Sequence, residues 1–453
     1  MRNVLLIARN FAPVSHVSAE RATKLAKYLP RFGWRPTVLT GAHATAGLAE
    51  DPALLDQVSG VPLIRSRAPE FSLFYASRSR GKGTESSYRG APKRGSWHPK
   101  SWLVPDSQVL WYPFAVTAAL RAARGTRWDA IIATSFPPTA LLVAHTVSAR
   151  LGIPYIADFR DAWTTHYQAP RRPAPIADLE RRLERRMIRD AAAVVSVDAR
   201  FVEHVYAGIP QEDRPPLHVI RNGYDEDDFE GVEPAALPQF SIVHTGQLRQ
   251  PPRALWEALG HALRDRPELR GKLHLWQIGF VEPGTERVLK AAPDGVTVHY
   301  IPPVSQREAI GFMLGADLLL VEEYGSAWPS KTLQYLRAGR PILAFVPRDG
   351  MIREVLETVP LAHVMAHDET ARAGQVIAEL AALPRTRAGT PPAHVTAYSR
   401  REIARRYAAL LDEVSKASVQ PGGGLRDQRL GGLEVGGGHA EEPATHDRLD
   451  RGL

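Results

Sequence analysis

The sequence predicts an α/β protein built from two doubly wound, Rossmann-like domains that face each other across a cleft. Short apolar runs typical of buried parallel strands alternate with segments of helical periodicity. The alternation pauses at an acidic stretch that contains glycine and proline, and then restarts. A length of 453 residues allows two or three domains. We predict a first domain at 1–225, a linker at 226–238, a second domain at 239–395, a helix at 396–415 and a disordered, glycine-rich tail at 416–453.

The first domain opens with a complete strand–helix–strand unit. Residues 4–8 form an apolar strand, Ser18 is a plausible N-cap, and residues 36–40 form the second strand. The same reasoning predicts further strands at 129–134, 154–157 and 191–197, with helices at 114–124, 139–151 and 178–190. Residues 78–100 are rich in Arg, Lys, Gly and Ser, which predicts a mobile basic loop.

The second domain repeats this alternation. The predicted strands lie at 240–244, 273–278, 296–300, 316–321 and 341–345, and the helices between the first four lie at 253–264, 283–292 and 306–314. A further helix begins at Pro329, where the missing N–H costs nothing, and ends at Gly339. This helix places Lys331 and Gln334 at the carboxyl end of a buried strand, where ligands bind in open α/β sheets.

The composition excludes several classes of function. The chain has no cysteine, which excludes disulfides and thiolate metal sites and fits a cytoplasmic location. No window approaches the ~18–20 uninterrupted apolar residues of a spanning helix, and the N-terminus reads as a strand and not as a secretory signal. The net charge of +8 suits anionic partners, yet no nucleic-acid-binding motif accompanies it. No His, Asp or Glu cluster has the spacing of metal ligands, so we expect no metal.

A polar cluster follows the strand at 154–157. Asp158 and Asp161 flank Arg160, so one carboxylate could deprotonate a hydroxyl group that Arg160 orients. The alternative is a structural network of ion pairs. His16 in the first loop and Asp106 lie near the same edge of the predicted sheet.

Several motifs, taken in order, resemble the family 4 glycosyltransferases of GT-B fold, in particular the branch found in bacterial surface-polysaccharide gene products. The resemblance spans residues 1–415 and rests on the segments 32–40, 135–138, 157–163, 220–225, 244–246 and 329–341. It implies a glycosyltransferase, hexosyltransferase-like, that moves a sugar from a nucleotide-sugar donor to a polysaccharide or lipid-linked glycan acceptor. Retention of configuration and independence of metal are implied as well. The nucleotide sugar is then a substrate, and no cofactor is expected.

The resemblance also assigns roles to residues. The N-terminal domain would hold the acceptor, the second domain the donor, and the final helix would cross back onto the first domain. The implied donor-binding residues are Gly246, Arg249, Arg253, Ser330, Lys331 and Gln334. The implied catalytic residues are His16, Asp158 and Asp161, with Asp106 and Arg160 on the acceptor side.

The sequence departs from the family pattern at two positions. Members usually carry two glutamates, eight positions apart, at the donor site. These fall here on Ser326 and Gln334. Gln334 can still exchange hydrogen bonds with ribose hydroxyls, and Glu322 or Glu323 could replace the first glutamate if the loop bends suitably.

Two other functions remain open at this stage. They are a GT-B nucleotide-sugar epimerase, which would consume donor without acceptor, and a non-catalytic nucleotide-sugar-binding protein. We expect peripheral contact with an anionic membrane surface, because basic residues gather in the N-terminal half. They are Arg121, Arg124 and Arg127, the loop at 78–100, and the arginines of the helix at 178–190. The alternative for that helix is a solvated surface on which Glu180 and Glu184 pair with neighbouring arginines.

Overall fold

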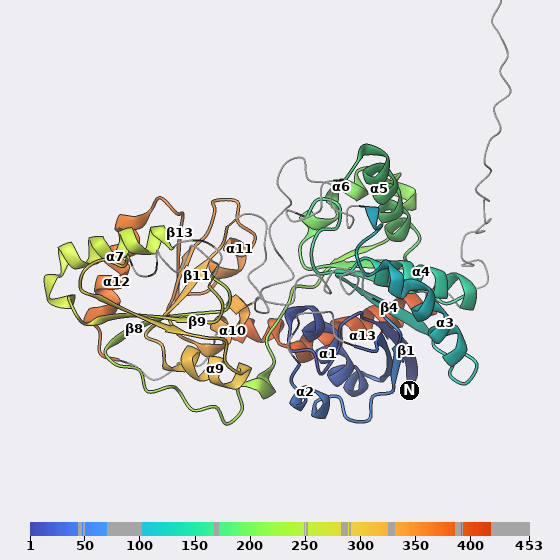
Figure 1. The fold of residues 1–453 in the computed structure, drawn as a ribbon, viewed down its shortest axis with the longest axis horizontal. Coiled ribbons are helices and arrows are strands. Elements are labelled where there is room, and N and C mark those ends of the chain that lie inside the picture. Colours follow the sequence, from blue (N-terminus) through green and yellow to red (C-terminus); the bar gives the residue numbers. More distant parts are fainter. Residues whose placement is uncertain are drawn as a thin grey trace, which may run out of the picture.

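The chain folds into two parallel sheets with helices on both faces of each (Figure 1). The structure is a computed structural model that describes residues 1–43, 48, 50–69, 102–166, 172–248, 250, 252–281, 289, 291–324, 331–385, 391 and 393–417. The predicted basic loop at 78–100 and most of the predicted helix at 283–292 lie outside the described residues. The same holds for the predicted tail beyond 417.

The first sheet has the strand order β3-β2-β1-β4-β5-β6-β7. All of its neighbouring strands pair in parallel. The strands are β1 (Arg2–Ile7), β2 (Trp34–Gly41), β3 (Leu63–Ser66), β4 (Ala130–Ser135), β5 (Tyr155–Phe159), β6 (Ala193–Ser196) and β7 (Leu217–Val219). The helices between them are α1 (Val17–Tyr28), α2 (Ala53–Asp56), α3 (Tyr112–Ala122), α4 (Thr139–Leu151), α5 (Ala174–Arg189) and α6 (Glu203–Tyr206).

The second sheet has the strand order β10-β9-β8-β11-β12-β13 and is also parallel. Its strands are β8 (Phe240–Thr245), β9 (Leu273–Ile278), β10 (Val296–Ile301), β11 (Leu318–Glu322), β12 (Ile342–Phe345) and β13 (Ala362–Met365). Its helices are α7 (Arg253–Asp265), α9 (Gln306–Gly315), α10 (Lys331–Ala338), α11 (Arg353–Leu356) and α12 (Thr370–Ala382). The predicted fold class is confirmed.

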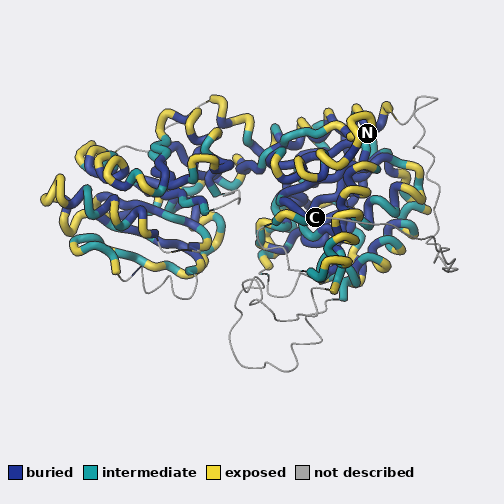
Figure 2. Tube along the Cα trace, turned by 90° about the horizontal axis from the view of Figure 1, so that it is seen from above, coloured by how far each residue is buried: buried dark blue, intermediate teal, exposed yellow. Residues whose placement is uncertain are grey.

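Side chains alternate along the strands, so each sheet buries two apolar faces. Figure 2 shows buried residues running through the interior of both domains. Leu5 and Ile131 point to α3 and α4, whereas Val4 and Leu6 point to α1 and to α13 (Arg400–Ala417). Helix α13 therefore packs on the first sheet, although it follows the second sheet in the sequence.

The segment between the sheets is fastened to α1. Asp225 accepts hydrogen bonds from Lys24 at 2.6 Å and Lys27 at 2.8 Å, and Lys24 also reaches Asp228. Burial alone would raise the pKa of Asp225, but the two ammonium groups outweigh it and hold the pKa at about 2. The linker thus enters the second domain from a fixed point on the first.

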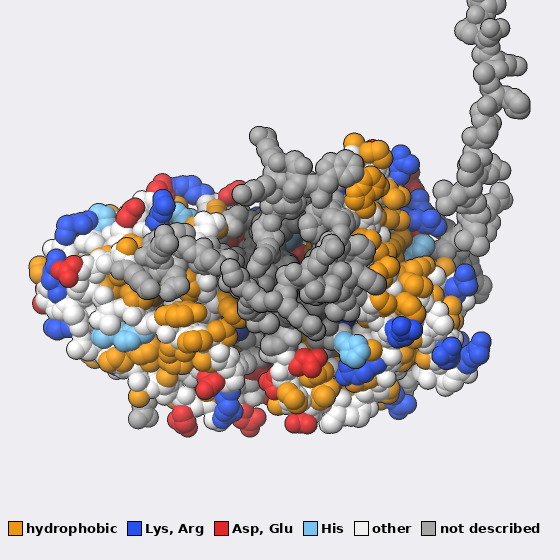
Figure 3. All heavy atoms as spheres, in the orientation of Figure 1, with side chains coloured by type: hydrophobic (Ala, Val, Ile, Leu, Met, Phe, Trp, Pro, Cys, Tyr) orange, Lys and Arg blue, Asp and Glu red, His pale blue; other side chains and the backbone are white. Residues whose placement is uncertain are grey.

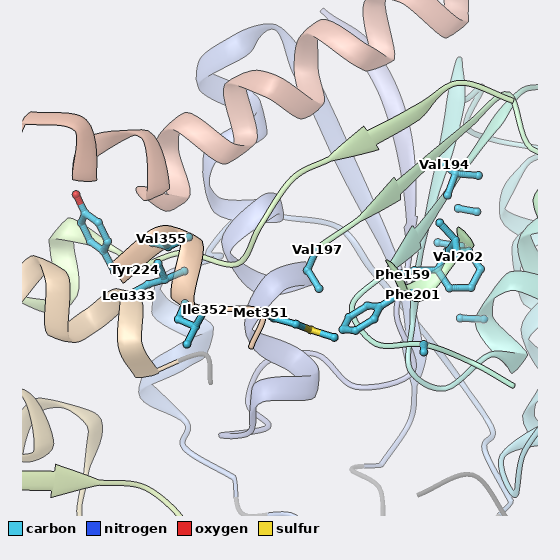
Figure 4. Packing of buried hydrophobic residues seen from close by; sticks show 14 of the residues in the cluster. Phe159, Val194, Val197, Phe201, Val202, Tyr224, Leu333, Met351, Ile352 and Val355 are labelled. Carbon is cyan, nitrogen blue, oxygen red and sulfur yellow. The ribbon is translucent and has the colours of Figure 1, made fainter. Parts of the chain in front are cut away.

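The core continues from one domain into the other. Figure 4 shows Met351 of the second domain reaching towards Phe201 of the first, with Val197 beside them. Polar contacts accompany this apolar junction, because Arg200 donates to the backbone oxygen of Asp349 at 3.0 Å. One apolar core therefore spans both domains and fixes them to each other near the carboxyl ends of their strands.

Candidate functional site

The strongest candidate site lies where the strand order of the second sheet reverses, between β8 and β11. Crevices at such switch points bind ligands in open α/β sheets. Gly246 follows β8 with φ 117°, and Lys331 opens α10 after β11. A Cβ placed on Gly246 would lie 3.9 Å from Cγ of Lys331. The structure therefore brings together two residues predicted to bind the donor.

Buried polar groups fix the shape of the Gly246 loop. The Gly246 N–H donates to the Ile278 oxygen at 2.7 Å, and Gln277 Nε2 donates to the Gly246 oxygen at 3.0 Å. The Thr245 N–H donates to the Tyr335 hydroxyl at 2.8 Å, which ties the loop to α10. These supports were not predicted, since a glutamine within a strand and a tyrosine on a buried helix face have no distinctive spacing.

Lys331 is a cation in a largely buried setting. Burial lowers the pKa of Lys331, and the charges of Glu20 and Asp228 partly offset that effect. Glu20 belongs to α1 and pairs with Arg400 at 2.8 Å. The donor-side lysine therefore lies under the influence of acidic groups from α1 and from the linker.

Several buried polar atoms beside this loop have no hydrogen-bond partner within the part of the chain that the structure describes. They are the side-chain oxygens of Gln334, Thr332 and Glu322. Buried polar groups in native proteins are nearly always paired, because an unpaired one costs about 1–3 kcal/mol. Burial raises the pKa of Glu322 to about 8, with the Tyr324 phenol as its polar neighbour. Unpaired acceptors next to a buried lysine fit a ligand rich in hydroxyl and phosphate groups.

The two glutamates considered as replacements for the missing family glutamate behave differently. Glu323 accepts hydrogen bonds from the backbone N–H groups of Met351 at 3.0 Å and Ile352 at 3.4 Å, so it braces the start of α11. Among the described residues Glu322 accepts no backbone N–H, and its polar neighbour is the Tyr324 phenol.

The remaining donor-side predictions are less well defined. Arg253 is the exposed first residue of α7, and its charge acts on Tyr324 near Glu322. Arg249, Ser326 and Ser330 lie outside the described residues. The described residues contain no group of three or more His, Asp or Glu side chains that could hold a metal ion.

On the acceptor side, the structure places Asp158 in a buried ion pair. Its Oδ2 accepts from Arg21 Nε at 3.1 Å, and both side chains are at most 1% exposed. Arg21 also donates to the Ile220 oxygen at 2.8 Å and to the Tyr407 hydroxyl at 2.7 Å. These contacts correspond to the structural alternative weighed for this cluster. Arg21 and Tyr407 were not predicted, because they lie 137 and 386 positions from their partners Asp158 and Arg21.

Arg160 fastens its own loop to two others. It donates from Nε to the Ser135 oxygen at 3.0 Å, from Nη1 to the Val17 oxygen at 2.9 Å and from Nη2 to the Phe136 oxygen at 2.8 Å. Its neighbour Asp161 is partly exposed at the end of β5. The two carboxylates that flank Arg160 therefore sit in contrasting surroundings, one buried and one at the surface.

His16 and Asp106 both cap helices. His16 Nδ1 accepts from the Ser18 N–H at 3.1 Å at the start of α1, which leaves the ring proton on Nε2. Burial, followed by the charge of Arg160, lowers the pKa of His16, so the ring is neutral at pH 7. Asp106 accepts from the N–H of Thr139 at 2.7 Å, at the first turn of α4.

Comparison with known families agrees with this architecture. Residues 18–223 match the model of the glycosyl transferase 4-like domain. This match covers most of the first domain and confirms the resemblance seen in the motifs. The bacterial surface-polysaccharide branch stays a prediction. No curated protein matches the sequence.

Solved structures share the complete two-domain fold. Sucrose-phosphate synthase from Thermosynechococcus elongatus is 15% identical with a TM-score of 0.62, over 92% of this chain and 100% of that one. α,α-Trehalose 6-phosphate synthase from Burkholderia multivorans is 11% identical with a TM-score of 0.58, over 92% and 100%. Anabaena Alr3699/HepE in complex with UDP is 14% identical with a TM-score of 0.55, over 91% and 100%. The fold is therefore GT-B.

Proposed function

We propose that this protein is a glycosyltransferase that moves a sugar from a nucleotide-diphosphate sugar to a polysaccharide or lipid-linked glycan acceptor, with retention and without a metal. The observation that carries the proposal is the meeting of Gly246 and Lys331 at the switch point of the second sheet. The glycosyl transferase 4-like match of the first domain supports it.

The donor side offers what departure of a nucleotide diphosphate requires. When the bond between the anomeric carbon and the diphosphate oxygen breaks, negative charge develops on that oxygen. The stem of the Lys331 side chain and the N-terminus of α10 lie next to Gly246, whose lack of a side chain lets the backbone approach a phosphate. The unpaired oxygen of Gln334 can accept a hydrogen bond from a ribose hydroxyl.

On the acceptor side, Asp161 is the carboxylate we propose to contact the acceptor hydroxyl. It is partly exposed at the carboxyl end of β5, whereas the buried Asp158 is engaged by Arg21. His16 can donate from Nε2 to the sugar or to a phosphate oxygen. The new glycosidic bond forms to the acceptor oxygen, and the hydroxyl proton leaves with the diphosphate.

We propose that transfer takes place in the cytoplasm, at the inner face of the cell membrane, in the biosynthesis of a cell-envelope polysaccharide. A lipid-linked acceptor would reside at that surface. None of the described helices is long and apolar enough to cross a membrane, so membrane contact would be peripheral.

A thermal-shift panel with UDP-, GDP-, ADP- and dTDP-sugars tests donor binding. A ligand at 100 times its Kd adds about 2.7 kcal/mol to stability, so one nucleotide should raise the melting temperature selectively. The proposal further predicts release of that nucleotide when acceptor glycans are added. If the folded protein responds to no member of the panel, the proposed donor site is wrong.

A second candidate is a non-catalytic nucleotide-sugar-binding protein, which Gln334 favours because the family usually has a glutamate there. Gln334→Glu discriminates between the two. A weak enzyme should gain or shift transfer activity, whereas a pure binding protein should gain none. An epimerase would be recognised by conversion of the donor sugar to an isomer without any acceptor.

A further inference from the structure

Helix α5 has two faces of opposite chemistry. Its exposed residues include Arg181, Arg182, Arg185, Arg186 and Arg189. Its two glutamates point inwards, with Glu180 8% and Glu184 1% exposed. Glu180 pairs with Arg172, just before the helix, at 2.7 Å. Within the described part of the chain neither glutamate pairs with an arginine of α5 itself, so the solvated helix with such pairs along it is wrong.

The glutamates serve the acceptor-side loop instead. Glu180 accepts from Trp163 Nε1 at 3.0 Å, and Glu184 accepts from the Thr164 hydroxyl. Both partners belong to the loop that follows β5 and carries Asp161. The inner face of α5 thus holds the acceptor-side loop in place.

The outer face of α5 carries an excess of positive charge. Two carboxylates pair with these arginines: Asp178 with Arg181, and Asp190 with both Arg186 and Arg189. Within the described part of the chain, Arg182 and Arg185 form no ion pair. Like charges one helical turn apart repel each other, so an anionic partner would relieve an unfavourable arrangement.

Apolar side chains accompany these arginines. Leu179 on α5 is 46% exposed, and Trp102 is 49% exposed. Arg172, just before α5, donates to the backbone oxygens of Leu103 and Pro105, both at 2.9 Å, and so holds the segment next to Trp102 near the start of the helix. Figure 3 shows hydrophobic side chains gathered over the region of α5, α4 and α3, with Lys and Arg side chains along its border.

We infer that the outer face of α5, with Leu179 and Trp102 beside it, docks on an anionic phospholipid surface. Basic side chains with exposed apolar groups between them are the composition that binds such an interface, the arginines to headgroups and the apolar groups below them. Docking here would bring the acceptor-side loop to the membrane. That docking serves a lipid-linked acceptor rests on the proposed function, whereas binding to the lipid surface does not depend on it.

Co-sedimentation with vesicles tests this inference. Vesicles of phosphatidylcholine with phosphatidylglycerol should retain the full-length protein at low salt, and pure phosphatidylcholine vesicles should not. Arg182→Gln with Arg185→Gln should weaken binding about 25-fold, from about fivefold per cationic side chain. Leu179→Ser should weaken the binding that persists at high salt.

The matched control is Arg266→Gln with Arg372→Gln, which removes the same charge from the second domain. Unfolding curves confirm that each variant is folded. The inference is overturned if the wild-type protein ignores anionic vesicles, or if the control pair weakens binding as much as the α5 pair. The assay contains no donor or acceptor, so a failure of the proposed transfer activity leaves its result readable.

Discussion

Replacing Asp158 with Asn separates a structural role of this carboxylate from a catalytic one. Asp158 neutralises Arg21, and both side chains are at most 1% exposed. The variant keeps the size of the side chain and leaves the guanidinium group buried without a counter-charge. Removing one partner of a buried ion pair costs about 3–5 kcal/mol. Arg21 retains its bonds to Ile220 and Tyr407, so we expect a loss near the lower end, about 3 kcal/mol.

Urea unfolding followed by tryptophan fluorescence measures this loss. Asp158→Asn should unfold at a clearly lower urea concentration, whereas Asp178→Asn, at an exposed pair with Arg181, should change stability by less than about 1 kcal/mol. Asp161→Asn should lower the transfer rate in a protein that stays folded. The reasoning is refuted if Asp158→Asn keeps the wild-type unfolding curve and loses transfer activity.

Two further predictions concern the domain junction and the donor side. Gly223→Ala places a Cβ 2.0 Å from the Tyr398 oxygen and should cost about 1–3 kcal/mol in urea unfolding. A Cβ on Gly125 would have nothing within 4 Å, so Gly125→Ala should change the free energy of unfolding by less than about 0.5 kcal/mol. Equal losses of stability in the two variants would contradict the predicted clash at Gly223. Burial raises the pKa of Glu322 from 4.5 to about 8, so the unfolded chain loses this proton first as pH rises. Stability should therefore fall between pH 4.5 and 8, by at most ~1.4 kcal/mol per pH unit. Urea unfolding at pH 5 and pH 8 should show no such fall in stability for Glu322→Gln. If the variant loses as much stability between the two pH values as the wild-type protein, the raised pKa of Glu322 is not its cause.

The fold could be predicted from the sequence because local patterns determine it. Buried parallel strands leave continuous apolar runs, and Gly339 and Pro341 mark a helix end without any tertiary information. The bounds of α4, Thr139–Leu151, agree with the prediction because a proline pair precedes the helix and Gly152 follows it.

The candidate site could be predicted only in part. Gly246 and Lys331 were found because each follows a strand whose end lies at the switch point. The surroundings of Asp158 and Arg160 could not be found, since their partners come from distant segments. A carboxylate beside an arginine looks the same in a sequence whether it serves chemistry or a buried ion pair. The inward turn of Glu180 and Glu184 depends likewise on the loop after β5.

Calorimetric titration of nucleoside diphosphates tests the central claim most directly, that Lys331 and the Gly246 loop form the donor site. One nucleoside diphosphate should bind the wild-type protein. Lys331→Ala should weaken its binding about 10- to 100-fold, the effect of losing one charge-assisted hydrogen bond of about 1.5–3 kcal/mol. Lys272→Ala, at an exposed lysine of the same domain, should bind normally. Equal affinity of the Lys331→Ala variant and the wild-type protein, or no binding of any nucleoside diphosphate, would contradict the account.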